Sequence, residues 1–330
     1  MSRLLLISPA FHGYWRSIAQ AFTDLGYDVT AHPYDGGTKI ERVRRKVRYQ
    51  IPERLGLATD AQQRRCISER TASIVRRVRP DRLLVIKGDL LDAQFWDEFG
   101  PIPSVLWLYD ELRRTLHDDA SLAPYRAIAS YSHDDVASLS GALRSVAYVP
   151  LAFDQRTVVT PRQTNEIVFV GARYPRRAQL LVDLSDRGIP VRAYGQDWSS
   201  HPVDMVRTYR YRPAGVPAAR TLARAAAYDV MAGAPATLNI HGDQDGFTMR
   251  TFEAGGIGAV HLVDRPDVQE FYEPGREVAV FENDDELADL SRRAINDAAW
   301  GDGLRNAARK RTLAEHTFTH RARSLETLWG

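Results

Sequence analysis

Short apolar runs of strand length alternate with helical segments along nearly the whole chain, and this alternation constrains the fold more than any other feature. The first run is Arg3–Ser8, and residues 14–25 follow with apolar side chains at helical spacing and a stop at Gly26. Strands that alternate with helices are typical of a parallel sheet covered by helices on both faces. The sequence therefore predicts an α/β architecture.

The same rhythm occurs twice. In the first half, further strands are predicted over residues 27–31, 82–86, 104–108, 127–131 and 145–149, with helices over 38–49 and 58–78. Residues 150–165 contain two prolines and many polar side chains without a period, which indicates a linker. After it, strands are predicted over 166–170, 191–194, 236–240, 259–263 and 278–281, and helices over 175–187, 216–229, 248–256, 284–297 and 302–328.

Two doubly wound, Rossmann-like domains are therefore expected in this chain of 330 residues, the first over 1–152 and the second over 153–315. Ligands of such sheets bind beyond the carboxyl ends of the strands, so two facing domains are expected to form an interdomain cleft.

Several classes of protein are excluded by what the sequence lacks. Cys66 is the only cysteine, which rules out disulfide scaffolds and cysteine-based metal sites. His316 and His320 are four residues apart without an acidic partner between them, so we expect no zinc and no metal ligand set. Because no apolar run approaches a membrane span, a cytoplasmic protein is expected.

Charge is unevenly distributed. Residues 39–79 hold 13 basic and four acidic side chains, a balance of +9, whereas the whole chain carries only +2. This basic stretch is either a solvated helical face or a surface for an anionic acceptor or the inner face of a membrane, where the protein would be peripheral. A nucleic acid partner is a further alternative that depends on charge alone.

The densest group of candidate site residues lies between positions 239 and 258. A strand enters a loop with Gly242 and Gly246, and a helix starts near Thr248, so the amides of Thr248 and Met249 can bind a diphosphate. Asp245 and Glu253 could accept hydrogen bonds from sugar hydroxyls. The alternative is an Asp/Gly turn followed by an exposed helical glutamate.

These residues carry a resemblance to a known family. Asp245-Gly-Phe-x5-Glu253 resembles the E-G-F-x5-E signature of glycosyltransferases that use nucleotide sugars and have the two-domain GT-B fold. The segments DGFTMRTFEAGGIGAVHLVDR, FYEPGREVAVFENDDELADL and RTLAEHTFTHRARSLETLW are similar to the CgeB-like branch, which is the spore-maturation-protein type. The resemblance is strong over the C-terminal domain and loose over the N-terminal one.

The resemblance implies transfer of a sugar from a nucleoside-diphosphate donor, bound by the C-terminal domain, to an acceptor on the N-terminal domain. Glu253 matches the carboxylate that holds the donor ribose, and Asp245 matches the one that contacts the donor sugar, although it is one methylene shorter than the usual glutamate. No bound metal or other cofactor is expected. A helix formed by residues 316–330 is expected to cross back to the N-terminal domain, as in many relatives.

Fixed cations would then stabilise the leaving diphosphate. Arg173 resembles the family's G-R position, and Arg176 or Arg177 its second basic residue, with Arg177 preferred. Arg250 falls in the R-x-F-E pattern, where it either faces phosphate or supports the loop.

Two loops of the N-terminal domain follow strands at the expected cleft edge. His12 and Gly13 lie in the first, where Gly13 permits close approach of a ligand, and Asp110 lies in the second. If the enzyme inverts configuration, Asp110 or His12 is the candidate general base; the likeness to E-x7-E leans towards retention, which needs no separate base. Lys87-Gly88-Asp89 is a weaker candidate at the same edge.

The sequence leaves the acceptor open: a glycan, a lipid-linked acceptor, a protein, a small molecule or a modified DNA base. Two other functions also remain as alternatives. One is a non-catalytic protein that keeps the GT-B fold and binds sugar nucleotides, and the other is a GT-B epimerase of sugar nucleotides.

Overall fold

The computed structural model describes residues 1–36, 60–141 and 145–330, and these divide into two compact units. Unit 1 comprises Met1–Leu151 together with Phe318–Gly330, and unit 2 comprises Ala152–Thr317. The predicted helix over 38–49 and residues 39–59 of the basic stretch lie outside the described residues. No helix within the described ranges is long and apolar enough to cross a bilayer.

Unit 1 contains a parallel sheet of six strands in the order β2-β1-β3-β4-β5-β6. The strands are β1 (Arg3–Ser8), β2 (Asp28–Pro33), β3 (Arg82–Ile86), β4 (Ser104–Trp107), β5 (Ala127–Ser130) and β6 (Ser145–Tyr148). The helices are α1 (Tyr14–Asp24), α4 (Asp60–Val78), α5 (Ala93–Phe99), α6 (Asp119–Leu122), α7 (His133–Leu139) and α14 (Phe318–Glu326), with 3₁₀ turns η1 (Phe11–Gly13), η3 (Leu112–Arg114) and η5 (Thr327–Trp329).

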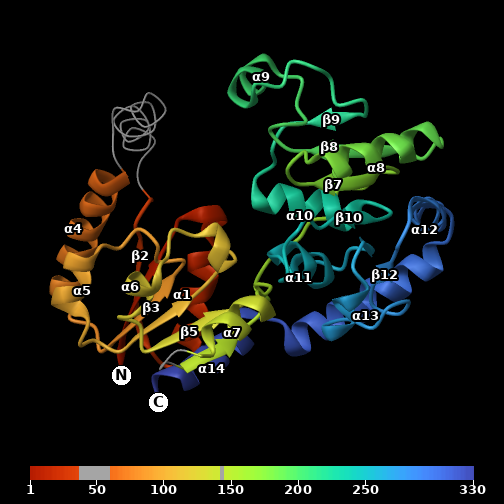
Figure 1. Cartoon of the computed structure of the whole chain (residues 1–330). Helices are drawn as coiled ribbons and strands as arrows, with labels where there is room; N and C mark the ends of the chain where they lie inside the picture. Colours follow the sequence, from red (N-terminus) through yellow and green to blue (C-terminus); the bar gives the residue numbers. More distant parts are fainter. Residues whose placement is uncertain (37–59, 142–144) are drawn as a thin grey trace. The chain divides into compact units, whose positions relative to one another are not determined.

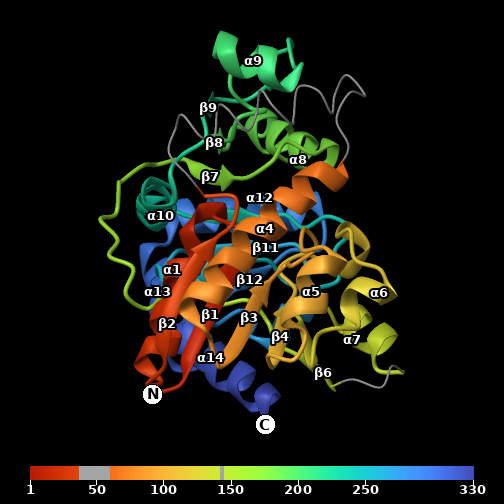
Figure 2. The same ribbon diagram turned by 90° about the vertical axis from the view of Figure 1, so that its left-hand side faces the viewer.

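Helices cover both faces of this sheet, as the alternation predicts (Figures 1 and 2). Alternate strand residues such as Leu5 and Val85 pack with α4 and α5 in one buried cluster. On the other face α1 packs against α14, where the rings of Phe22 and Trp329 meet edge to face at 5.8 Å. The last segment of the chain therefore completes the core of unit 1.

Unit 2 repeats the architecture with the strand order β12-β11-β10-β7-β8-β9, again parallel throughout. The strands are β7 (Ile167–Val170), β8 (Val191–Tyr194), β9 (Ala218–Ala219), β10 (Thr237–Asn239), β11 (His261–Val263) and β12 (Ala279–Val280). The helices are α8 (Pro175–Asp186), α9 (Pro202–Thr208), α10 (Arg224–Gly233), α11 (Met249–Gly256), α12 (Asp284–Asn296) and α13 (Ala298–Glu315), with the 3₁₀ turn η4 (Pro266–Glu270).

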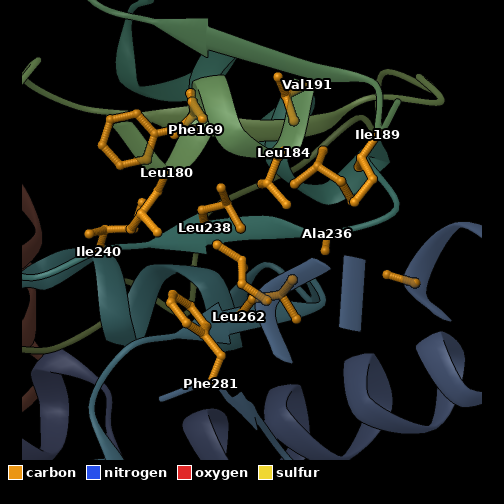
Figure 3. Close-up of a cluster of buried hydrophobic side chains, with 14 of the residues drawn as sticks. Phe169, Leu180, Leu184, Ile189, Val191, Ala236, Leu238, Ile240, Leu262 and Phe281 are labelled. Atoms are coloured by element: carbon orange, nitrogen blue, oxygen red, sulfur yellow. The ribbon is translucent and has the colours of Figure 1, made fainter. Parts of the chain in front are cut away.

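The core of unit 2 joins α8 and α12 to the strands. Figure 3 shows Leu180 and Leu184 of α8 gathered against Leu238 of β10, and all three side chains are buried. On the other face of the sheet, α11 packs against α13, and Gly256 at its end lies against Phe153. A Cβ atom at Gly256 would overlap the Phe153 ring, so this close packing requires glycine at position 256.

Two element predictions are wrong. The expected helix over 216–229 begins only at Arg224, because Ala218–Ala219 pair with β8 as an edge strand. The expected helix over 302–328 is two helices, α13 and α14. The break falls at His316 and Thr317, where the His316 carbonyl accepts a hydrogen bond of 2.9 Å from the Phe153 amide.

Candidate functional site

The predicted donor residues of unit 2 gather at the carboxyl edge of its sheet. The chain order runs outward on either side of the β7/β10 pair, so this pair is the switch point at which ligands of parallel sheets bind. Because the strands are parallel, β7, β8, β10 and β11 all end at this edge, and the loops that follow them start there. Arg173, Arg177, Asp245, Thr248 and Met249 come from these loops and the helices that follow them.

Arg177 connects the two strands of the switch point. Its Nε donates 2.8 Å to the Ile240 carbonyl after β10, and its Nη1 donates 3.3 Å to the Ala172 carbonyl after β7. The guanidinium also stacks on the Tyr174 ring, 4.7 Å from its centroid. Burial lowers the pKa of Arg177 from its ordinary value. Arg177 therefore fixes the spacing of the two loops, and its predicted contact with phosphate stays a prediction.

Arg173 lies in the same loop but has a different environment. Its backbone N–H donates 2.6 Å to Asp197 Oδ2, and its guanidinium contacts the carbonyls of Arg212 and Pro213 at 3.5 and 3.2 Å. Burial and then the nearby charge of Arg210 lower the pKa of Arg173. Two arginines thus concentrate positive charge beside this edge, and Arg210 is one that the sequence reasoning missed.

The loop between β10 and α11 is held by residues that follow β11. Asp264 Oδ1 accepts hydrogen bonds from the backbone N–H of His241 and from its Nδ1, both at 2.9 Å. Although burial raises it, these two bonds bring the pKa of Asp264 below its usual range. Arg265 donates 2.9 Å to the Gln244 carbonyl and stacks 4.1 Å from the Phe247 ring centroid.

Neither Asp264 nor Arg265 was among the sequence-based candidates. The position of Asp264 directly after a predicted strand is a signal that could have found it, because polar residues at carboxyl strand ends line such sites. Arg265 follows it by one residue.

Asp245, Thr248 and Met249 occupy the end of this loop and the start of α11. Asp245 is partly exposed, Thr248 is the N-cap residue, and Met249 opens the helix. The first amides of a helix have no partner within it, so this end favours an anion. The arrangement is the strand, glycine-containing loop and helix that the sequence predicts.

Glu253, which is buried, and Arg250, which is partly buried, form an ion pair on α11. The Arg250 guanidinium lies 2.9 Å from Glu253 Oε2, and the Tyr228 hydroxyl of α10 donates to Oε1. Glu253 is only 1% exposed. The contact of Glu253 with the donor ribose stays a prediction. Tyr228, which sequence reasoning missed, carries no local signal of this contact.

His261 provides a test of this buried region. Burial first, and then the charges of His241 and Arg250, lower the pKa of His261 to about 3 from 6.5. Between these values the unfolded chain binds a proton that the folded protein does not, so stability falls as pH is lowered from 6.5 towards 3. We expect a loss of up to about 1.4 kcal/mol per pH unit from this group, and His261→Leu should remove that loss. Urea unfolding of both proteins between pH 7 and 4.5 measures it, and equal pH slopes would contradict the assignment.

The candidates of unit 1 lie at the carboxyl edge of the other sheet, around a cavity of about 480 Å³. Asp110 lines this cavity, and its Oδ2 is 3.5 Å from Lys87 Nζ. His12 is exposed beside it, with its ring edge-on to Phe11 at 4.1 Å. Gly13 has a φ of 74° and is the N-cap residue of α1, so it serves the tight turn before that helix.

Comparison with known protein families finds a match over residues 176–327, to a family described as glycosyl transferase-like. No curated protein matches the sequence of this chain.

Solved structures give a second comparison. Sucrose-phosphate synthase (tll1590) from Thermosynechococcus elongatus is similar at 14% identity and a TM-score of 0.62, over 100% of this chain and 98% of that one. Alr3699/HepE from Anabaena, in complex with UDP-glucose, is similar at 11% identity and a TM-score of 0.63, over 99% of both chains. The DNA modifying enzyme beta-glucosyltransferase is similar at 12% identity and a TM-score of 0.58, over 98% of both chains.

The two parallel sheets of six strands match the GT-B fold of these structures. The region that matches the family extends over α11, the loop before it, and helices α12 to α14. Residues 176–327 therefore match a glycosyl transferase-like family, and the chain as a whole has the GT-B fold.

Proposed function

We propose that the chain transfers a sugar from a nucleoside-diphosphate sugar, held at the carboxyl edge of unit 2, to a hydroxyl group of an acceptor held by unit 1. The observation that carries this proposal is the bond of 2.8 Å from Arg177 Nε to the Ile240 carbonyl, which brings the arginine loop after β7 against the loop that leads into α11. A diphosphate at this switch point meets helix amides and guanidinium groups together.

The residues have distinct roles in this proposal. The amides at Thr248 and Met249 and the charge of Arg173 bind the diphosphate, Glu253 holds the ribose, and Asp245 contacts the donor sugar. Arg250 holds the Glu253 carboxylate in place from 2.9 Å. Arg177 holds the two loops at the spacing that the diphosphate requires.

Bond cleavage places the electron pair of the C1–O bond on the terminal phosphate oxygen, and the acceptor oxygen forms the new bond to C1. Fixed positive charge stabilises this leaving group without a bound metal in the proposed mechanism. The acceptor proton goes to that phosphate oxygen if configuration is retained, which the Asp245-x7-Glu253 pattern favours. It goes to Asp110 or His12 if configuration is inverted.

Uridine diphosphate is the first nucleotide to test, because HepE was solved with UDP-glucose and beta-glucosyltransferase with uridine diphosphoglucose. We also propose that the chain belongs to the CgeB-like branch, on the motifs from Asp245 through the last helix.

The experiment incubates the full chain with UDP-, GDP- and dTDP-sugars, with and without EDTA, and measures release of nucleoside diphosphate. Slow donor hydrolysis that is unchanged by EDTA supports the proposal, and proton NMR of the product gives the anomeric outcome. Binding without any turnover over hours would instead favour a non-catalytic sugar-nucleotide-binding protein. Nucleotide release together with a rearranged sugar would favour an epimerase.

A further inference from the structure

The cavity of unit 1 has a place, a volume and a lining that suit a small ligand. It lies at the switch point of the first sheet, where the residues directly after β1, β2, β3 and β4 meet, and its volume of about 480 Å³ is that of a pocket for a small molecule. Its described lining combines aromatic rings, carboxylates and two cations.

Aromatic rings form one continuous wall of the cavity. The ring centroids of Phe11 and Tyr14 are 6.3 Å apart, and those of Tyr14 and Tyr109 are 6.4 Å apart. At the rim, Phe11 is 62% exposed and Leu116 is 51% exposed. Two large apolar side chains exposed at one cavity mouth suit a ligand with a flat or apolar ring face.

Acidic side chains outnumber basic ones in the described lining of the cavity. Asp35, Asp89 and Asp110 line the cavity with Lys87 and Arg114. Lys87 Nζ already lies 3.8 Å from Asp89 Oδ2 and 3.5 Å from Asp110 Oδ2. Arg114 is paired with Glu111 at 3.2 Å. Both cations are therefore compensated by carboxylates, and an anionic ligand would meet net repulsion.

The lining also offers groups for hydroxyls. Asp89 is 5% exposed, and its Oδ1 has no hydrogen-bond partner among the described residues. Burial, and then the charges of Asp89 and Asp35, raise the pKa of Tyr34, so its phenol stays neutral. Hydroxyl groups both donate and accept hydrogen bonds, so they can pair with carboxylates and a phenol alike.

Backbone strain adjoins the cavity on two sides. His12 and Lys87 have φ values of 47° and 66°, in the left-handed region that residues other than glycine rarely adopt. Such residues cost about 1–3 kcal/mol each and cluster at functional sites. The His117 ring contacts the Lys87 carbonyl at 2.6 Å, which holds the second of these loops.

We infer that this cavity binds the acceptor, and that the acceptor is a compact, uncharged, hydroxyl-bearing molecule whose ring stacks on the wall of Phe11, Tyr14 and Tyr109. The acceptor role depends on the proposed function, whereas the preference for a neutral ligand depends on the cavity alone. Anionic polymers and anionic headgroups are rejected at this site by Asp35, Asp89 and Asp110.

The test uses a matched pair of probes, 4-nitrophenyl β-D-glucopyranoside and 4-nitrophenyl β-D-glucuronide, which differ in one carboxylate. Each is titrated into the full chain without donor, and binding is followed by saturation-transfer NMR and calorimetry. We expect the neutral probe to bind at least about tenfold more tightly than the anionic one. Equal or tighter binding of the glucuronide overturns the inference, and so does the absence of binding by both probes.

Two pairs of variants test whether the probes bind in this cavity. Asp110→Asn should reduce the preference for the neutral probe at least about threefold, whereas Asp119→Asn, an exposed acid on α6 outside the lining, should not change it. Phe11→Ala should weaken the neutral probe about three- to tenfold, with the exposed Leu313→Ala as its control. A preference that survives Asp110→Asn unchanged, or equal effects of Phe11→Ala and Leu313→Ala, overturns the assignment to this cavity.

Adding a donor separates this inference from the proposed function. Faster consumption of a UDP-sugar in the presence of the neutral probe, with a glycosylated product, supports the acceptor role. Probe binding as expected without consumption of any nucleotide sugar contradicts the acceptor role together with the proposed function. Donor consumption together with equally tight binding of the glucuronide contradicts only the present inference.

Discussion

Replacing Arg173 by alanine should lower kcat for sugar transfer by about 10²–10³-fold, because the variant loses a fixed positive charge beside the developing diphosphate. The guanidinium lies at the carboxyl edge of unit 2 and contacts two backbone carbonyls, at 3.2 and 3.5 Å. Since it has five N–H donors, those contacts leave others for phosphate oxygens. Steady-state kinetics with the best donor of the panel measure the effect.

Fold and catalysis are separated by two further variants. Arg173→Lys keeps the charge but not the planar guanidinium with its paired N–H donors, so we expect an intermediate loss of activity. Arg187→Ala removes an exposed pair with Asp285 at the far end of α8 and should leave kcat within about twofold of the original. A loss of less than about tenfold in Arg173→Ala, with unchanged thermal stability, would move the main electrostatic role to Arg177 or Arg210.

Glu253→Ala should destabilise unit 2 and weaken donor binding together. The substitution leaves the partly buried Arg250 guanidinium and the buried Tyr228 hydroxyl without their carboxylate partner. Breaking a buried pair in this way costs about 3–5 kcal/mol, which lowers Tm by about 6–20 °C for a domain of this size. Calorimetry of the full chain measures the shift.

Glu253→Gln tests the ribose contact with less damage to the core. It keeps the shape and one acceptor oxygen but replaces the other oxygen by an NH2 donor and removes the charge, and we expect KM for the donor to rise about 10- to 100-fold. Tyr228→Phe is the matched control, because it removes one partner of Glu253 without touching the carboxylate itself. If the folded Glu253→Gln variant keeps the original KM for the donor, the ribose assignment is wrong and Glu253 is a purely structural residue.

The regular strands could be read from the sequence because each buries a short apolar run on both faces. Arg3–Ser8, Arg82–Ile86 and Val191–Tyr194 have the predicted bounds. The region from residue 202 to 219 could not be read in this way. Helix α9 is short and has few buried side chains, and β9 is a strand of two residues that exists only through pairing with β8.

Helix ends depend on partners that are distant in the sequence. Residues 302–328 have a continuous helical pattern, yet the helix breaks at His316 and Thr317. There the His316 carbonyl accepts the Phe153 amide, and the His316 ring contacts the Phe271 carbonyl at 3.1 Å. Local propensity cannot encode a bond to a residue more than 160 positions away.

For the site, the sequence by itself determined the doubly wound plan, the glycine-containing loop before α11 and the chemical types of its side chains, because these follow from local patterns. Only the tertiary structure decided which charges meet: Glu253 with Arg250 and Tyr228, Asp264 with His241, and Lys87 between Asp89 and Asp110. Parallel strands from distant parts of the chain end at a common edge, and the side chains that meet there are set by strand order and register rather than by spacing in the sequence.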